Sequence, residues 1–205
     1  MNNSNILEID ETLLIGNGRH KRVYLHPHTT TQCIKIAYKL PDPDIDRELK
    51  YRNLRNKNNN PATMLPNYYG TVPTTLGKGY VFERICDYDG NTSQTMYQFI
   101  ESHPFTDEHI KTVQAMLLQF KELYFTEKIL TYDMNPVNYL VQKLSPTKLT
   151  IKCIDDIGSS VLIPLELYIC YFHDAKVQRY WKKLIVKLKN RYPQFMTREF
   201  IKELE

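Results

Sequence analysis

The feature that most constrains this chain of 205 residues is a pair of glycines one residue apart, Gly16 and Gly18, ahead of a strand-like segment. Glycine closes tight turns and lets backbone amides approach a ligand, so the pair alone does not separate a phosphate-binding loop from an ordinary turn. A dinucleotide-binding fingerprint needs a helix directly after its glycines and an acidic residue about twenty positions later. Residues 22–26 alternate like a strand instead, which excludes that fingerprint.

Strand patterns in the first half of the chain predict a small antiparallel sheet. They occupy residues 13–15, 22–26, 32–38, 68–72 and 80–82, with turn-forming residues between them. One helix is expected within this half, over residues 45–57. Its acidic residues come early and its basic residues late, as the helix dipole favours.

The second half of the chain is predicted to be mostly helical. Thr106 is expected to cap a long amphipathic helix, whose apolar residues recur at helical spacing from Ile110 to Tyr124. Beyond it we expect a polar loop at 133–138, a hairpin with strands at 139–141 and 149–154, helical character over 165–190 and a short helix at 196–205.

These elements predict an α+β fold with two lobes. The polar segment 87–91 marks the expected boundary, because strand-like signals stop there and helical ones begin. Residues 1–86 would form a lobe with a small antiparallel sheet and one helix. Residues 87–205 would form a short, mostly helical lobe.

The position of Lys35 on the third predicted strand, with Val23 on the second, is typical of a kinase glycine loop. In such a loop the glycine amides approach the phosphates of ATP, the valine covers the adenine, and the lysine neutralises the α- and β-phosphates. A buried lysine needs a carboxylate partner, and Glu48 on the first helix is predicted to face inward. Asp46 is the competing candidate, and a solvated helix charge is the alternative role for Glu48.

Asp133 and Asn138 lie five residues apart in the loop that precedes the hairpin. In phosphoryl transfer an aspartate takes the proton of the attacking hydroxyl, and an asparagine oxygen holds a metal ion on the phosphates. The alternative role for Asp133 is that of a turn former. A second metal carboxylate is expected after the hairpin: strand parity favours Asp155, whereas the Asp-x-Gly spacing to Gly158 selects Asp156. We favour Asp155 and keep Asp156 as the alternate. Oxygen ligands of this kind suit Mg²⁺.

The order of these motifs resembles the YrbL-type proteins of the PhoP regulatory network, a bacterial group related to protein kinases. The segments that carry the resemblance are residues 16–21, 33–36, 47–51, 68–72, 89–90, 136–138 and 155–158. The resemblance implies a two-lobed, protein-kinase-like fold with ATP between the lobes. By analogy with kinases, Phe82 would border the adenine pocket, and the Glu83 carbonyl and Ile85 amide would hydrogen-bond the base.

The chain also departs from the kinase pattern. Lys21 stands where the third glycine is expected, and Thr131-Tyr132 replaces the His-Arg before the catalytic aspartate. Few residues separate Gly158 from the next predicted helix, which leaves no room for a long activation segment. We therefore expect an ATP- and Mg²⁺-dependent phosphotransferase that acts on a small molecule or an unusual substrate. The alternative is a pseudokinase, a nucleotide-binding regulatory or scaffold protein without turnover.

Composition excludes several other classes of protein. The net charge is +4, with charges of both signs interspersed, so no dominant polyanion-binding signal emerges. The basic residues of segment 176–191 are a possible weak polyanion contact, with a solvated helix face as the alternative. Four cysteines without a CxxC pair indicate reduced thiols and no zinc site. No apolar run reaches the ~18 residues of a membrane span, so we expect a soluble, cytoplasmic protein.

Overall fold

The computed structural model describes residues 6–159 and 170–205. Its contacts group the chain into two compact units, Met1–Pro43 with Pro66–Thr92 and Asp44–Leu65 with Ser93–Glu205. Antiparallel sheets and several helices make up the structure, which confirms the α+β class predicted from the sequence.

The first unit is built on one antiparallel sheet of five strands, with the order β1-β2-β3-β5-β4. All five predicted strands are confirmed in type and order. Their bounds are β1 Leu14–Asn17, β2 Lys21–His26, β3 Thr29–Ala37, β4 Tyr68–Thr74 and β5 Gly77–Glu83, and a short 3-10 helix, η1, precedes them at Glu11–Leu13. The apolar residues that alternate along β2, β3 and β5 form a small core of their own, which includes Tyr24, Ile34 and Val81.

The second unit combines five helices with a three-stranded antiparallel sheet, among the residues that the structure describes. The bounds are α1 Pro43–Lys57, β6 Gln94–Thr95, α2 Met96–Glu101, α3 Asp107–Glu127, η2 Pro136–Asn138, β7 Tyr139–Ser145, β8 Lys148–Cys153, α4 Cys170–Arg191 and α5 Arg198–Leu204. The strand order of the sheet is β6-β7-β8. The predicted long helix, hairpin and final helix are confirmed.

Local signals explain where most of these helices begin. Thr106 caps α3 as predicted, since its side chain accepts a hydrogen bond from the His109 amide. The helix α2 was not predicted, because six residues are too few for a periodic pattern; a capping box between Thr95 and Gln98 defines its start. Helical character was expected from Leu165, and residues 165–169 lie outside the described part of the chain.

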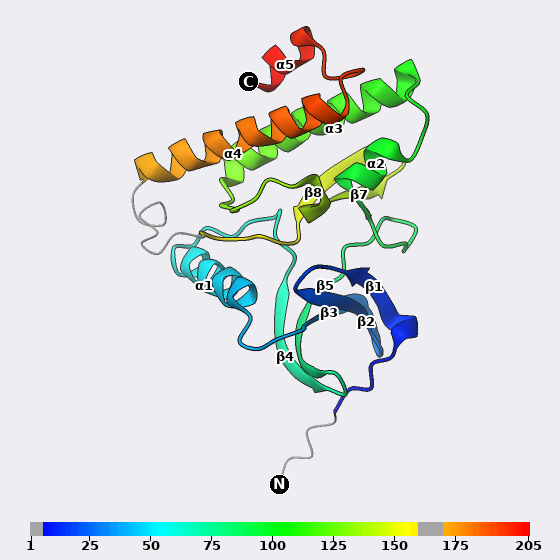
Figure 1. Ribbon diagram of the computed structural model, residues 1–205, viewed down its shortest axis with the longest axis vertical. Coiled ribbons are helices and arrows are strands. Elements are labelled where there is room, and N and C mark those ends of the chain that lie inside the picture. The colour runs from blue at the N-terminus through cyan, green and yellow to red at the C-terminus, as the bar shows by residue number, and fades with distance from the viewer. Residues whose placement is uncertain (1–5, 160–169) are drawn as a thin grey trace. The chain divides into compact units, whose positions relative to one another are not determined.

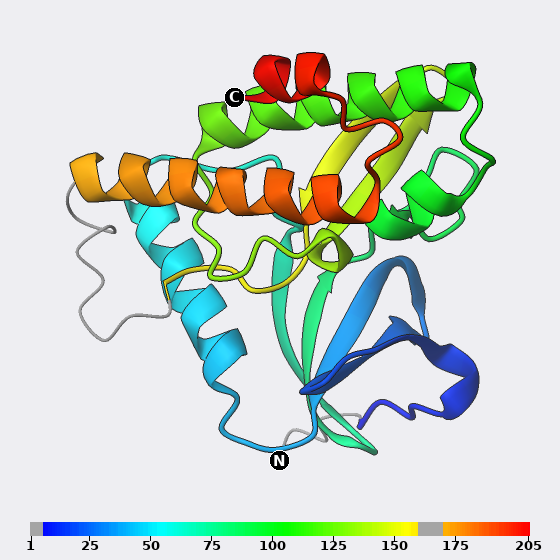
Figure 2. The same cartoon turned by 45° about the horizontal axis from the view of Figure 1, so that its top comes forward.

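Aromatic packing between α3, α4 and the hairpin forms the centre of the second unit. Figures 1 and 2 show α3 and α4 side by side and running in opposite directions. The ring of Phe120 on α3 lies 4.9 Å from that of Tyr139 on β7 and 5.3 Å from that of Trp181 on α4. Tyr124, one turn later on α3, stacks on Trp181 at 5.7 Å. Phe120 therefore touches all three layers of this core.

The helix α1 groups with the helical unit, although the sequence placed it in the sheet-containing lobe. Two side chains on its inner face account for this. Tyr51 Oη accepts the Leu130 amide at 3.1 Å, and Arg55 Nη1 donates to the Glu127 carbonyl at 3.0 Å. The Glu127 carbonyl lies at the end of α3, and the Leu130 amide lies in the segment after it. The lobe boundary expected between residues 86 and 87 stays a prediction.

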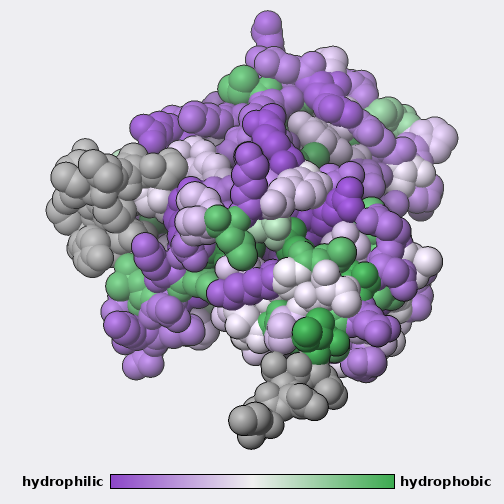
Figure 3. Space-filling view, turned by 60° about the horizontal axis from the view of Figure 1, so that its bottom comes forward, coloured by the Kyte–Doolittle hydropathy of each residue, from purple (hydrophilic) through white to green (hydrophobic). Residues whose placement is uncertain are grey.

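The surface carries no membrane-crossing helix in the part of the chain that is described: none combines sufficient length with sufficient apolar character. Figure 3 shows one face of the molecule, where apolar side chains form small separate groups among hydrophilic ones. Scattered apolar residues of this kind are ordinary on a protein surface and need no partner to cover them.

Truncation of Phe120 is expected to destabilise the protein strongly. Phe120→Ala should lower the free energy of unfolding by about 3–5 kcal/mol, because it removes ring contacts to three elements and leaves a cavity. Phe120→Leu should cost much less. The measurement is the urea midpoint, with Val186→Ala on the exposed side of α4 as the control, expected within about 0.5 kcal/mol of wild type. Equal losses for Phe120→Ala and Val186→Ala would contradict the central position of this ring.

Candidate functional site

In the first unit, three of the predicted nucleotide-binding residues lie in one row across the sheet. Gly16 on β1 pairs directly with Val23 on β2, and Val23 pairs directly with Lys35 on β3. Residues directly opposite each other in antiparallel strands point to the same face of the sheet. The side chains of Val23 and Lys35 therefore share the face on which Gly16 presents only a hydrogen. A Cβ atom at Gly16 would lie 3.4 Å from Val23 Cβ.

The tip of the glycine hairpin is held by hydrogen bonds from two directions. The Gly18 amide donates to the Lys21 carbonyl at 2.9 Å, so Lys21, which stands at the position of the third kinase glycine, closes the turn through its backbone. Tyr38 Oη donates to Asn17 Oδ1 at 2.6 Å. These contacts fix the backbone of the loop.

The residues expected around the adenine base lie at the end of β5. Phe82 lies on β5 itself, and its ring centroid is 4.2 Å from Lys35 Nζ. The Glu83 carboxylate accepts the Asn67 amide at 2.9 Å, which holds the start of β4 against the end of β5. Among the described residues, the Ile85 amide donates to no protein acceptor. A backbone donor left without a partner is available to a ligand.

Glu48, the predicted carboxylate partner of Lys35, forms an ion pair with Arg52 on the same helix. Arg52 Nη2 lies 2.6 Å from Glu48 Oε1. Glu48 and Lys35 belong to different units, so their pairing stays a prediction. The ion pair with Arg52 was not predicted from the sequence.

In the second unit, backbone hydrogen bonds hold the loop after α3 against the segment that follows β8. The Gly158 amide donates to the Leu130 carbonyl at 2.8 Å, and the Tyr132 amide donates to the Asp156 carbonyl at 3.0 Å. The Ile154 amide donates to the Asn138 carbonyl at 2.9 Å. Two segments about twenty residues apart in sequence are thereby fixed side by side.

This pairing brings Asn138 and Asp156 into direct contact. Asn138 Nδ2 lies 2.5 Å from Asp156 Oδ2. Asp155 Oδ1 accepts a hydrogen bond from the backbone amide of Asp156 at 2.9 Å. The backbone of Asp156 is left-handed, with φ of 58°, so the alternation of strand β8 does not continue through it. Of the two predicted metal carboxylates, Asp156 is the one that faces Asn138.

The surroundings of Asp156 disfavour its charged form. Burial raises the pKa of its carboxyl group above the ordinary value, and the nearby charges of Asp155 and Asp133 raise it further. Hydrogen bonds from Tyr132 and Asn138 act in the opposite direction. A cation bound to Asp156 would relieve this crowding of carboxylates, which is the condition that a metal site requires.

Asp133, the predicted catalytic base, is paired with a lysine from α4. Lys187 Nζ lies 2.6 Å from Asp133 Oδ1, and both side chains are roughly half exposed. An ion pair with this exposure contributes only about 0–1 kcal/mol, so a ligand can displace it. The sequence did not single out Lys187, because 54 residues separate it from Asp133 and it reads as one of many basic residues on a helix.

Arg47 on α1 is a second residue that the sequence did not single out. Its guanidinium lies 4.3 Å from the centre of the Tyr132 ring and 3.0 Å from Asp44 Oδ1. Burial, followed by a hydrogen bond to Asp156, raises the pKa of Tyr132 well above its ordinary value. Tyr132 thus links Arg47 to the candidate metal ligand. Its hydroxyl stays protonated at neutral pH and can donate to Asp156.

The donor set of the second unit fits a magnesium ion better than a transition metal. Within the described ranges, no group of three or more histidine, cysteine, aspartate or glutamate residues could hold a metal. Mg²⁺ needs fewer protein ligands, since it keeps several waters and binds one or two carboxylates together with substrate phosphates. Asn138 Oδ1 and the Asp156 carboxylate would supply such a pair; in the structure Asn138 Nδ2 donates to Asp156 Oδ2. Cys33, Cys86 and Cys153 are free thiols, as predicted, and burial raises the pKa of Cys33 to about 11.

Comparison with known proteins identifies the family. The family model described as "PhoP regulatory network protein YrbL" matches residues 7–189. The chain belongs to this family. Relatives in Escherichia coli (strain K12) and Shigella flexneri, each described as "Uncharacterized protein YrbL", are 34% identical over 185 residues, which cover 89% of this chain and 88% of each relative. The resemblance found in the sequence is confirmed.

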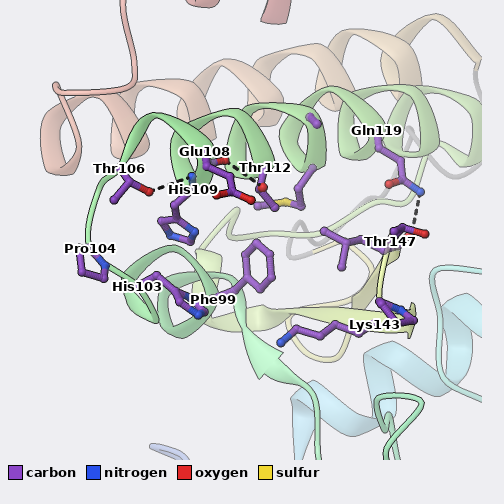
Figure 4. Close-up of a pocket in the computed structure, with 14 residues that line it drawn as sticks. Phe99, His103, Pro104, Thr106, Glu108, His109, Thr112, Gln119, Lys143 and Thr147 are labelled. Atoms are coloured by element: carbon purple, nitrogen blue, oxygen red, sulfur yellow. Dashed lines mark hydrogen bonds between the residues drawn. The ribbon is translucent and has the colours of Figure 1, made fainter.

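This YrbL-family chain also contains a cavity of about 730 Å³ in the second unit, between α2, α3 and the β7–β8 hairpin. Figure 4 shows His109 and Gln119 on its α3 side and Lys143 on the hairpin. Its polar groups are largely used within the protein: His109 Nε2 lies 2.8 Å from the Ile100 carbonyl oxygen, and Gln119 Nε2 donates to the Leu149 carbonyl at 2.7 Å. None of the predicted site residues lines this cavity, so it is separate from the candidate phosphoryl-transfer site.

Substitution of Gly158 is expected to disturb the segment after β8, which holds Asp156. Its φ is +98°, and an added Cβ atom would lie 3.0 Å from Arg47 Cγ. Gly158→Ala should therefore lower the free energy of unfolding by about 1–3 kcal/mol. Gly90→Ala is the control, since its φ is +85° but no heavy atom lies within 4 Å of its added Cβ. Thermal unfolding should show a larger loss for Gly158→Ala; an equal loss would mean that the Arg47 contact has no effect.

Proposed function

We propose that this YrbL-family protein is an atypical kinase-like phosphotransferase that binds ATP and Mg²⁺. In this proposal the two units correspond to the two lobes of a protein-kinase-like fold. The observation that carries the proposal is the 2.5 Å contact between Asn138 and Asp156, next to the loop that holds Asp133. These residue types have separate roles in phosphoryl transfer and follow one another along the chain in the expected order, which supports the proposal.

The row of Gly16, Val23 and Lys35 supports nucleotide binding by the first unit. In the proposed complex the amides of Gly16 and Gly18 approach the phosphates, Val23 covers the adenine, and Lys35 neutralises the α- and β-phosphates. Glu48 would orient Lys35, as proposed from the sequence.

The end of β5 supports recognition of the adenine base. Phe82 would border the base, and the Glu83 carbonyl would accept from its amino group. The Ile85 amide, which has no acceptor among the described residues, would donate to a ring nitrogen. These three groups come from four consecutive residues, so their relative positions are set by one short segment of backbone.

The acidic residues of the second unit support magnesium binding and proton transfer. Asn138 and Asp156 would hold Mg²⁺, and Asp155 stays the second candidate ligand. When bound, Mg²⁺ neutralises the charge on the β- and γ-phosphates. Asp133 would accept the proton of the acceptor hydroxyl while the hydroxyl oxygen bonds to the γ-phosphorus. The bond from that phosphorus to the bridging oxygen breaks in the same step, and its electron pair leaves on ADP.

A pseudokinase is the alternative, and one observation favours it. The carboxylate of Asp133 is already paired with Lys187 at 2.6 Å, so the proposed base is not free in this structure. In that case nucleotide binding would act only as a switch for a regulatory or scaffold role. The two functions differ in turnover and agree in nucleotide binding, so they require separate measurements.

Nucleotide binding is tested by thermal unfolding with ATP and Mg²⁺. A ligand at about 100 times its Kd stabilises the folded state by about 2.7 kcal/mol, which raises the Tm of a protein of this size by roughly 5–10 °C. Lys35→Ala and Asp156→Ala should each remove most of this shift, and Asp155→Ala should keep most of it. Lys78→Ala, which removes an exposed lysine of β5, is the control. Equal stabilisation of all variants would overturn the site assignment.

Catalysis is tested by Asp133→Asn, which keeps the size of the side chain and removes the base. The variant should keep the thermal shift with ATP and Mg²⁺ and lose turnover or autophosphorylation by about 100-fold or more. The measurement is the rate of ADP release. If wild type never turns over ATP, the enzyme function is wrong and the pseudokinase remains.

A further inference from the structure

Nearly all the charged side chains of helix α4 are basic. Over Cys170–Arg191 it has seven basic residues and one acidic residue, Asp174. The chain as a whole has a net charge of only +4, with both signs interspersed. The positive charge is therefore concentrated on this one helix, which suits a local anion site rather than a field that covers the whole protein.

Two lysines at the ends of one face of α4 contact the loops that hold the candidate catalytic residues. Lys176 Nζ lies 3.1 Å from Ser159 Oγ, directly after the segment of Asp156, and Lys187 Nζ lies 2.6 Å from Asp133 Oδ1. The 3.6-residue period of the helix places Lys176, Lys183 and Lys187 within an arc of about 40°. The face between the two contacts is thus fixed beside the candidate active-site loops.

Arg179 and Lys183 lie between these contacts and are both exposed. Their charged groups lie 5.4 Å and 4.8 Å from the centre of the Tyr180 ring. Among the described residues, neither forms an ion pair with a carboxylate. Lys176 Nζ also lies 5.8 Å from this ring, so three cations surround it. The exposed charges of Arg179 and Lys183 repel each other, and an anion bound between them would relieve that repulsion.

We propose that this face of α4 binds the phosphate acceptor and selects an acceptor that carries a phosphate or carboxylate group. This inference rests on the proposed function, because the acceptor hydroxyl would lie at Asp133. Lys183 is one helical turn from Lys187, about 6 Å along the axis, and Arg179 is about 12 Å away. The acceptor is therefore a small hydroxyl compound whose anionic group lies about 6–12 Å from the reacting oxygen.

Lys187 joins the two parts of this acceptor site. It is the one residue of this face that contacts the proposed base, so an acceptor that displaces its ion pair frees Asp133 and meets Lys187 at the same time. An acceptor without a negative charge would form no ion pair with Lys183 or Arg179. No favourable contact would then offset the loss of the ion pair between Lys187 and Asp133. Selectivity for an anionic acceptor follows from this coupling.

The test measures binding of glucose 6-phosphate to the full chain by calorimetry. Glucose, which lacks the charged group, is the control ligand. Wild type should bind glucose 6-phosphate and not glucose. The double variant Arg179→Met, Lys183→Met should weaken binding by about a hundredfold, because each of the two lost charge-assisted contacts contributes about one decade. The control is Lys182→Met, Lys189→Met, which removes the same charge from exposed positions elsewhere on α4 and should change binding less than about twofold.

Further arms separate this inference from other outcomes. Lys35→Ala should leave glucose 6-phosphate binding unchanged, which excludes the proposed nucleotide site as its location. Equal losses in the two double variants, no binding by wild type, or binding only to anionic lipid vesicles or nucleic acid would each overturn the inference. Because no nucleotide is present, a failure of ATP and Mg²⁺ to stabilise the protein would disprove the proposed function and leave the anion site standing.

Discussion

The arrangement of the second unit depends on the backbone hydrogen bonds between the loop after α3 and the segment after β8. They join Leu130 to Gly158, Tyr132 to Asp156 and Asn138 to Ile154. A backbone hydrogen bond contributes only about 1 kcal/mol net, but three of them over a short stretch leave the two segments little freedom to shift. The contact between Asn138 and Asp156 is a consequence of this pairing. The left-handed turn at Asp156 then directs its carboxylate toward Asn138.

The balance of charge around these loops comes from elements that are distant in sequence. Burial raises the pKa of Asp156, and the neighbouring carboxylates of Asp155 and Asp133 raise it further. Arg47 from α1 reaches this region through Tyr132, and Lys187 from α4 reaches Asp133. Each cation is held on a helix that the aromatic core or the end of α3 fixes in place. The packing of the unit and the electrostatics of the loops are therefore linked, since a shift of α4 would move Lys187.

Much of the fold followed from local patterns in the sequence. Alternation predicted the five strands of the first sheet, and apolar spacing with the Thr106 cap predicted α3. The grouping of α1 with the helical unit could not be predicted, because its periodicity defines an inner face but not the element that this face contacts. Strand parity favoured Asp155, but it is Asp156 that contacts Asn138, since β8 ends at Cys153 and the alternation stops there.

The sequence by itself determined which side chains are available and in what order: glycines before a lysine strand, then an aspartate, an asparagine and a pair of aspartates. Spacing along a strand or loop is a local property, so a pattern in the sequence can carry it. Only the tertiary structure decided that Asp156 meets Asn138 and that Lys187 meets Asp133. Those contacts join residues 18 and 54 positions apart, and their geometry depends on how whole elements pack rather than on any short segment.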